Sequence, residues 1–307
     1  MAGGAVFAEG PSRAGNASRW LFRRQHRFAW LLLVPVLAIL IPLFLLPAAV
    51  LLRNSLNWDD PSAIMVADFS LANYARILTD PYYASLFGNS MLVAVGVAVI
   101  TLVIGYPFAY YLVRWAGERR NLLLWIIYTP LIVSVITRVF GWMIITADSG
   151  LINTLLIAIG VTEGPIHILF EVSGMVIGMV HRYLPLMILP LANSIAKIDL
   201  RIQLASTSLG AGSAATFARV IVPLSLPGIV AGLQLVIAVV LSDFVLPTLL
   251  GTTRFRMLAP AIYDEAIANV RWANSAAMAI LMVAVVVLVL ISMNLALRRA
   301  APWARSF

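Results

Sequence analysis

Four ionisable side chains lie in or beside long apolar runs of the sequence: Arg138, His181, Arg182 and Asp243. On insertion scales a charge at the centre of a bilayer costs about 2.5–3.5 kcal/mol, so each group should face protein or a water-filled path. Two interpretations of Asp243 stay open. Its carboxylate either lines a translocation path and attracts an ammonium group, or it is the structural partner of an arginine, such as Arg138, on a neighbouring helix.

The basic groups allow similar alternatives. Arg138, with Trp142 one helical turn further along, either lines the same path or extends to the outer membrane surface. His181 and Arg182 fall in the middle of an apolar run, where a buried pair satisfied by backbone carbonyls is favoured. The candidate path residues are therefore Asp243, Arg138, Trp142 and Arg182.

Signatures of catalysis are missing from the sequence. It contains no G-x-x-x-x-G-K-[ST], so we predict no P-loop of that kind for ATP on this chain. It has no H-E-x-x-H, its three histidines are scattered at positions 26, 167 and 181, and no Ser/His constellation of a membrane hydrolase is visible. The absence of cysteine excludes disulfides and thiolate metal sites. We predict no catalytic residue and no metal site.

The composition indicates what holds these polar groups. Of the 307 residues, 62% are hydrophobic and 11% charged, and the mean hydropathy is +0.97, whereas soluble domains carry roughly 25% charged residues. Residues 28–52 form a run without a charge that exceeds the roughly 20 residues of a membrane-spanning helix. A signal peptide would have a shorter apolar region, about 7–15 residues, and this run contains Pro35, Pro42 and Pro47. The chain is predicted to be an integral membrane protein.

Hydropathy predicts an all-α protein with six transmembrane helices. Their expected ranges are 28–52, 88–113, 122–146, 169–195, 221–250 and 273–297. The transmembrane domain is thus expected over 28–297, between an N-terminal tail of residues 1–27 and a C-terminal tail of residues 298–307.

The basic residues predict the orientation of these helices. Fourteen of the 21 Lys and Arg residues lie in the two tails, the loop after the second helix and the loop between the fourth and fifth. Because positive residues stay in the cytoplasm, both termini are expected to face inward. The net charge of +8 is then a topology signal, and no basic cluster interleaved with aromatics indicates nucleic acid as a partner.

One inner loop is unusual in being small, polar and glycine-rich. The stretch from Ala205 to Gly228 reads ASTSLGAGSAATFARVIVPLSLPG. We expect a short helix over 199–208, a turn at 210–212, where glycine tolerates positive φ, and a second helix over 213–220. The residues alone fit either a helix pair that docks into a partner or a plain amphipathic linker.

This loop resembles the coupling motif of ABC importer permeases, which runs E-A-A, three residues, Gly, about nine residues and I-x-L-P. Here Leu204-Ala205-Ser206, Gly210 and Ile221-Val222-Pro223 occupy those places, with Ala211 and Phe217 also in step. The motif's glutamate falls on Leu204, so only the docking position is carried over. The positions that the resemblance assigns to ATPase coupling are Gln203, Leu204, Ala205, Ser206, Gly210, Ala211, Phe217 and Pro223.

Other stretches resemble the same superfamily and, within it, the B-type permease of spermidine/putrescine importers. They are Gly105-Tyr106-Pro107 with Ala109-Tyr110, residues 130–153, Leu241 to Pro247 (LSDFVLP), Ile262-Tyr263 and Arg271-Trp272. The resemblance implies the fold of a type I importer permease in a bacterial inner membrane. It also implies a second, homologous permease, a pair of ATPase subunits that hold ATP and Mg²⁺, and a substrate-binding protein. The binding protein would dock on the outer loop that contains a short helix over 71–78.

The function predicted on this basis is import of polyamines or a related amino-bearing solute. Opines, aminophosphonates or another small solute would suit the same scaffold. From a different class, an ion-gradient-driven secondary transporter acting alone, with Asp243 as its cation site, stays an alternative.

Overall fold

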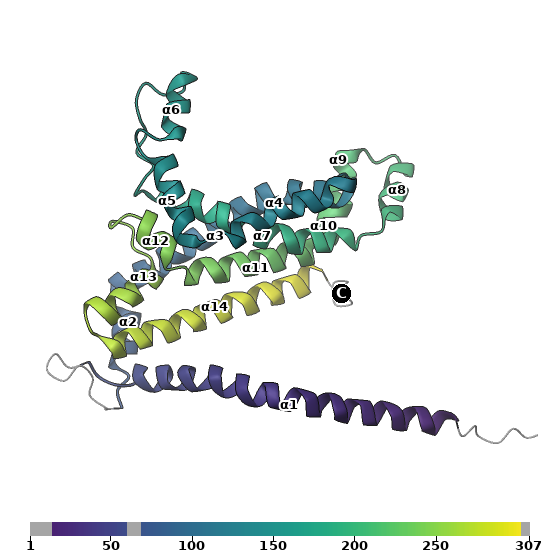
Figure 1. Cartoon of the computed structure of the whole chain (residues 1–307), viewed down its shortest axis with the longest axis horizontal. Coiled ribbons are helices and arrows are strands. Elements are labelled where there is room, and N and C mark those ends of the chain that lie inside the picture. The colour runs from purple at the N-terminus through teal and green to yellow at the C-terminus, as the bar shows by residue number, and fades with distance from the viewer. Residues whose placement is uncertain (1–13, 60–68, 302–307) are drawn as a thin grey trace, which may run out of the picture. The chain divides into compact units, whose positions relative to one another are not determined.

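The computed structural model describes residues 14–59 and 69–301, and side chains within these ranges except those of residues 14–33 and 300. Every secondary-structure element in these ranges is a helix, as predicted (Figure 1). The chain divides into two units, one ending at Arg53 and the other beginning at Asn54.

The first unit contains α1, Ala14–Ser55, except for its last two residues, which belong to the second unit. It contains the first predicted span together with its three prolines, which a membrane helix tolerates. The helix begins well before residue 28, so residues 14–27 of the predicted tail are helical. Residues 1–13 of that tail lie outside the described residues, as do residues 302–307 of the other.

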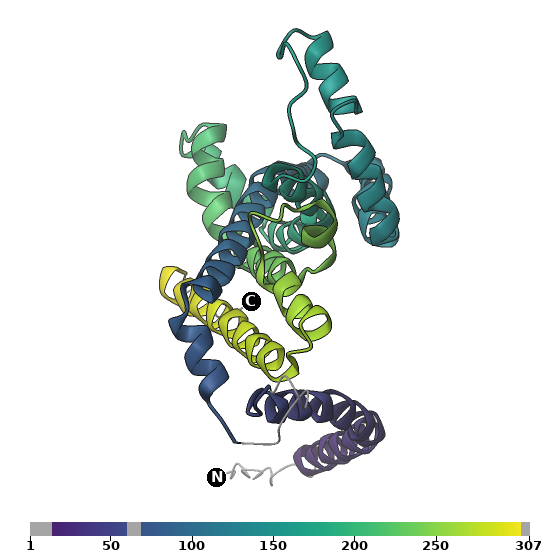
Figure 2. The ribbon, with the colours of Figure 1, turned by 90° about the vertical axis from the view of Figure 1, so that its left-hand side faces the viewer.

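The core of the second unit is three long helices that pack on one another: α3 (Pro81–Arg114), α7 (Val172–Ala196) and α11 (Leu226–Ser242). A fourth, α14 (Trp272–Ala300), packs on α11 (Figures 1 and 2). Small residues permit these close approaches. A Cβ on Gly228 of α11 would lie 2.4 Å from Cβ of Ser194 and 2.8 Å from the carbonyl oxygen of Pro190, both on α7. The predicted second, fourth and sixth spans are therefore confirmed, although α3 begins seven residues earlier than expected.

The third predicted span, 122–146, was wrong as a single helix. It consists of α4 (Arg120–Ile132) and α5 (Val135–Thr146), and Ser134 between them is extended, with φ −50° and ψ 137°. Pro130 lies in the last turn of α4, where it removes one backbone donor. The segment long and apolar enough to cross a membrane is instead Val135–Ala158, which includes α6 (Leu151–Ala158).

The fifth predicted span, 221–250, is also interrupted. The helical segments Ser213–Leu224 and Leu226–Ser242 meet at a 63° bend around Ser225. The chain breaks again at Asp243 before α12 (Val245–Leu250). Within the described ranges five helices are long and apolar enough to span a membrane, or six if the bent pair is one span.

Shorter helices occupy the two ends of this bundle. At one end lie α8 (Leu200–Ser208), α9 (Ser213–Thr216), the π-helix η2 (Phe217–Ile221) and α10 (Val222–Leu224). At the other end lie α2 (Ala72–Thr79), which confirms the short helix expected over 71–78, α13 (Leu258–Tyr263) and the π-helix η3 (Asp264–Ala268). A single 3₁₀ turn, η1 (Gly117–Arg119), joins α3 to α4.

Candidate functional site

The glycine-rich loop folds into the expected helix–turn–helix. The carboxylate of Asp199 accepts a hydrogen bond of 2.9 Å from the amide of Arg201 and so caps the start of α8. At the other end Gly210 has φ +84°, its amide donates to the carbonyl of Thr207, and the amide of Ala211 donates to that of Ser206. This pair of bonds is a Schellman motif, which requires a left-handed residue and favours glycine there.

The surface of α8 carries large apolar side chains that are exposed. Leu204 is 65% exposed and Leu209, just beyond the last turn, 88%. Ala205 and Gly210 lie on the same exposed segment. Apolar side chains at this exposure, on a short helix that projects from the bundle (Figure 1), are typical of a surface that a partner covers.

The other predicted coupling residues lie less open to solvent. Ser206 is half-buried, and its hydroxyl lies 3.0 Å from that of Thr216 on α9. Gln203 is half-buried as well, with a buried amide nitrogen that has no hydrogen-bond partner. Ala211 is half-buried in the turn. These three residues shape the α8–α9 pair, whereas Leu204 and Ala205 form its surface.

Phe217 and Pro223 are placed differently from the rest of the predicted set. The ring of Phe217 packs edge-on against Tyr106 and Tyr110 of α3, with ring centroids 5.4 and 5.6 Å apart. Pro223 lies half-buried in α10, two residues before the bend at Ser225. Both residues connect the loop to the bundle, so the predicted set contains an exposed surface and its internal support.

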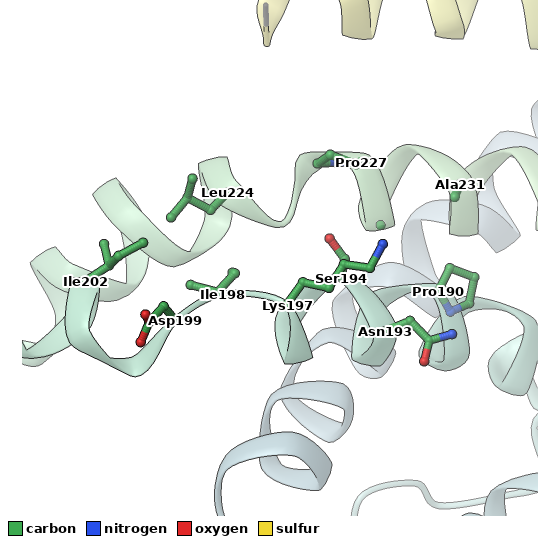
Figure 3. A pocket seen from close by; sticks show the side chains of 11 residues that line it. Pro190, Asn193, Ser194, Lys197, Ile198, Asp199, Ile202, Leu224, Pro227 and Ala231 are labelled. Carbon is green, nitrogen blue, oxygen red and sulfur yellow. The ribbon is translucent and has the colours of Figure 1, made fainter. Parts of the chain in front are cut away.

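A cavity that sequence reasoning missed lies where α8 joins the bundle. It has a volume of about 390 Å³ and opens between the end of α7, the start of α8 and the α10–α11 bend (Figure 3). Lys197 and Asp199 supply its charged groups. Gly228 in the same stretch was a usable signal of it, because its missing side chain lets α11 approach α7 here. Its lining residues are Pro190, Asn193, Ser194, Lys197, Ile198, Asp199, Ile202, Leu224, Pro227, Gly228 and Ala231.

A second polar cluster surrounds Asp243. Its carboxylate accepts a 2.5 Å hydrogen bond from the hydroxyl of Tyr183 and bonds of 3.0 and 3.4 Å from the amides of Val245 and Leu246. Nη1 of Arg182 lies 4.0 Å from the same carboxylate, whose side chain is 3% exposed. The side chain of Asp243 therefore caps the first amides of α12 and joins this helix to α7.

The arginine beside Asp243 is thus Arg182, and the suggested partner Arg138 was wrong. The guanidinium of Arg138 donates to the carbonyls of Pro130 and Val133, which are left without helical partners where α4 ends. Tyr183 was not singled out, although a hydroxyl in the middle of an apolar run next to Arg182 was a usable signal.

Trp142 and His181 form a pair between α5 and α7. The indole nitrogen of Trp142 donates to Nδ1 of His181 at 3.3 Å, and the two rings meet edge-on with centroids 5.5 Å apart. His181 is exposed and its hydrogen bond is made to a side chain, so the prediction of a buried pair satisfied by backbone carbonyls is wrong for His181. Candidate path residues on separate predicted helices are thus neighbours at the junction of α5, α7 and α12.

Sequence relatives decide the family. The spermidine/putrescine transport system permease protein PotB of Salmonella typhimurium is 33% identical over 270 residues, which cover 88% of this chain and 93% of that protein. PotB of Haemophilus influenzae is 32% identical, over 83% of this chain and 89% of its own length. The chain belongs to the PotB family of transport permeases. No protein-family model matches the sequence.

Solved structures give the fold of this PotB-family permease. One chain of a bacterial ABC transporter that imports the polysaccharide alginate superimposes with a TM-score of 0.73 over 92% of this chain and 99% of its own, at 15% identity. A chain of the MetNI methionine ABC transporter gives a TM-score of 0.53 over 72% of this chain, at 16% identity. At such identities the likeness shows the fold alone, which is that of an ABC importer permease.

Proposed function

We propose that this permease imports polyamines as one of two membrane-spanning subunits in an ATP-driven, binding-protein-dependent complex. The substrate class rests on the named spermidine/putrescine relatives at 33% identity. The observation that carries the mechanism is α8, a short helix with Leu204 65% exposed and a glycine-closed C-terminus. Such a helix fits a groove on an ATPase subunit, and the chemistry of ATP and Mg²⁺ belongs to that subunit.

The coupling site divides into two layers under this proposal. Leu204, Ala205 and the turn at Gly210 and Ala211 contact the ATPase. Gln203, Ser206, Phe217 and Pro223 hold this surface on the bundle. Because Leu204 replaces an acidic residue of the motif, burial of apolar area rather than an ion pair would supply the docking energy here.

The orientation of the permease in the membrane follows from the proposed docking of α8 on the ATPase. The α8–α9 end faces the cytoplasm of a bacterium, together with both termini, and the permease lies in the inner membrane. The opposite end, with α2 and α13, receives the binding protein. A second, homologous permease completes the path. We expect this partner to be a C-type subunit, so that the two permeases form a heterodimer.

The path passes the junction of α5, α7 and α12. Trp142 offers an indole face there, and an aromatic face attracts an ammonium group through a cation–π interaction. Arg138 and Arg182 are cations close to the same place, so the carboxylate of Asp243 offsets their repulsion of a cationic substrate while it holds α12. Arg182 and Asp243 thus set the shape and charge of the path, and Trp142 is the candidate for direct contact.

Uptake by proteoliposomes tests this proposal against a secondary transporter. The permease would be reconstituted alone and with its ATPase, second permease and binding protein, and labelled spermidine uptake would be measured. We expect uptake only in the complete set, with ATP. Uptake by the permease alone, driven by a proton or sodium gradient, would overturn the proposal in favour of a transporter with Asp243 as its cation site.

A further inference from the structure

Three side chains on one face of α3 contact the coupling segment, here defined as residues 199–224, or the residues that adjoin it. Tyr106, Tyr110 and Arg114 are spaced by four residues, and side chains four apart lie on the same face of a helix. Arg114 contacts the chain just before the segment, whereas Tyr106 and Tyr110 both contact Phe217 in its second half. Because these parts are distant in sequence, α3 is the element that they share.

Arg114 holds the chain where it leads into α8. Its Nη2 donates to the carbonyl of Ile198 at 2.9 Å and to that of Ile195 at 3.3 Å. Ile195 is in the last turn of α7, where the final helical carbonyls lack a partner within the helix, and Ile198 lies two residues beyond that helix. A cation is also favoured there by the helix dipole. Ile195 and Ile198 are buried, so these contacts fix backbone that solvent does not reach.

Tyr110 and Tyr106 hold the chain where it leaves the segment. Both rings meet Phe217 of η2 edge-on, with interplanar angles of 89° and 86°. The hydroxyl of Tyr106 lies 2.8 Å from that of Ser225, a fully buried residue at the 63° bend. The hydroxyl of Ser225 also donates to the carbonyl of Val222 at 2.9 Å. The bend is therefore fixed from inside the bundle.

We propose that Tyr106, Tyr110 and Arg114 clamp the coupling segment to α3, so that the segment and α3 move as one rigid body. This inference rests on the proposed function, because it assumes that α8 docks on the ATPase. Two flexible points would otherwise absorb a displacement of α8: residues 197–199 between α7 and α8, and the bend at Ser225. The three side chains are positioning residues that close both points.

Crosslinking tests rigidity directly, because the chain contains no cysteine. Tyr110→Cys and Phe217→Cys would be combined in one permease and reconstituted with the other subunits. Loss of the ring contact should lower binding-protein-stimulated ATPase activity by about two- to thirty-fold, the range of known effects along coupling routes. Joining the two thiols with a short bifunctional reagent should restore most of the stimulation. A crosslinked complex with stimulation abolished would show that α3 and the segment move apart, and would overturn the clamp.

The control pair is Phe108→Cys with Phe217→Cys. Phe108 is two positions from both Tyr106 and Tyr110, so it lies on the other face of α3, away from Phe217. This pair should therefore not crosslink, and the reagent should not change activity. Restoration of activity by the reagent in the control pair would also contradict the clamp.

Arg114→Gln tests the other end of the clamp without crosslinking. The ATPase should still co-purify with this variant in normal amount, while its stimulation by loaded binding protein falls. Arg114→Lys should retain part of the stimulation, and Arg119→Gln, a matched change at an exposed residue of η1, should retain all of it. If Arg114→Gln lowers the amount of folded permease and its association with the ATPase together, Arg114 contributes to stability alone. Its role in the clamp would then be overturned.

Behaviour of the wild-type complex separates an error in the proposed function from an error in the clamp. If no ATPase associates with the wild-type permease, the proposed function itself is wrong. If the wild-type complex is stimulated and both the crosslinked pair and Arg114→Gln behave contrary to expectation, only the clamp is wrong.

Discussion

The hydroxyl of Tyr183 donates a 2.5 Å hydrogen bond to the carboxylate of Asp243, and both residues are buried, at 2% and 6% exposure. The bond joins the middle of α7 to the point where the chain breaks between α11 and α12. Every group that faces this carboxylate is a donor, including the amides of Val245 and Leu246. Asp243 is therefore a structural acceptor whatever else it does in transport.

Replacing this acceptor should destabilise the permease. Asp243→Asn puts an amide donor among the existing donors and leaves Arg182 without its neighbouring charge, so we expect a loss of about 1–3 kcal/mol. Tyr183→Phe should cost a similar amount. Because the two residues share one bond, the double variant should lose less than the sum of the single changes. The free energy of unfolding of each variant, measured on purified permease in detergent, checks these expectations. Unchanged stability of Asp243→Asn with weakened spermidine uptake would show instead that Asp243 acts on substrate alone.

Two glycines in the turn of the coupling segment, Gly210 and Gly212, differ in backbone conformation. Gly210 has φ +84° and donates its amide to Thr207, and proline permits neither because its φ is near −65° and it has no N–H. Gly210→Pro should abolish co-purification of the ATPase while membrane insertion remains. Gly212, with φ −65° and open space around its Cα, is the matched control. Gly212→Pro should retain the ATPase. Normal co-purification with Gly210→Pro would mean that this turn does not shape the docking surface.

The contact between α7 and α11 depends on the missing side chain of Gly228. A methyl group there would lie 2.4 Å from Cβ of Ser194, so the helices would have to separate, and overpacking of this kind costs about 1–3 kcal/mol. Ser194→Gly in the same chain should recover part of that loss. Gly96→Ala on α3, where nothing lies within 4 Å, should cost nothing. Equal thermal stability of Gly228→Ala and Gly96→Ala would contradict this packing.

The first turn of α14 is capped by a residue more than 200 positions away. Both carboxylate oxygens of Asp59 accept hydrogen bonds of 2.8 Å, from the amides of Ala273 and Asn274. Asp59→Ala should cost about 0.5–2 kcal/mol, as for other lost helix caps, and Asp59→Asn should cost less. Amide hydrogen exchange should be faster at residues 273 and 274 in Asp59→Ala. Unchanged exchange there would show that the cap contributes nothing.

The sequence was informative where one local property decides the outcome. Long apolar runs predicted α3, α7 and α14 because length and apolarity alone determine a span. The left-handed Gly210 followed from the composition of its turn. The family followed from motif residues such as Gly210 and Leu241 to Pro247, read beside the hydropathy pattern.

The breaks in the helices were not predictable in the same way, because each depends on a side chain from elsewhere. Arg138 caps α4 from within α5, Tyr106 holds the bend at Ser225 from α3, and Asp243 begins α12 while bonded to Tyr183. Hydropathy treats the interrupted runs as continuous, so it merged α4 with α5 and α11 with α12. The partner of Asp243 was misassigned for the same reason.

The most direct measurement of the central claim is the ATPase activity of the reconstituted complex with its binding protein. Spermidine, putrescine and a neutral sugar would be added in turn. We expect stimulation by the two polyamines and none by the sugar, with the polyamine effect lost in Gly210→Pro. Stimulation by none of the three, or an ATPase that fails to associate with the wild-type permease, would contradict it.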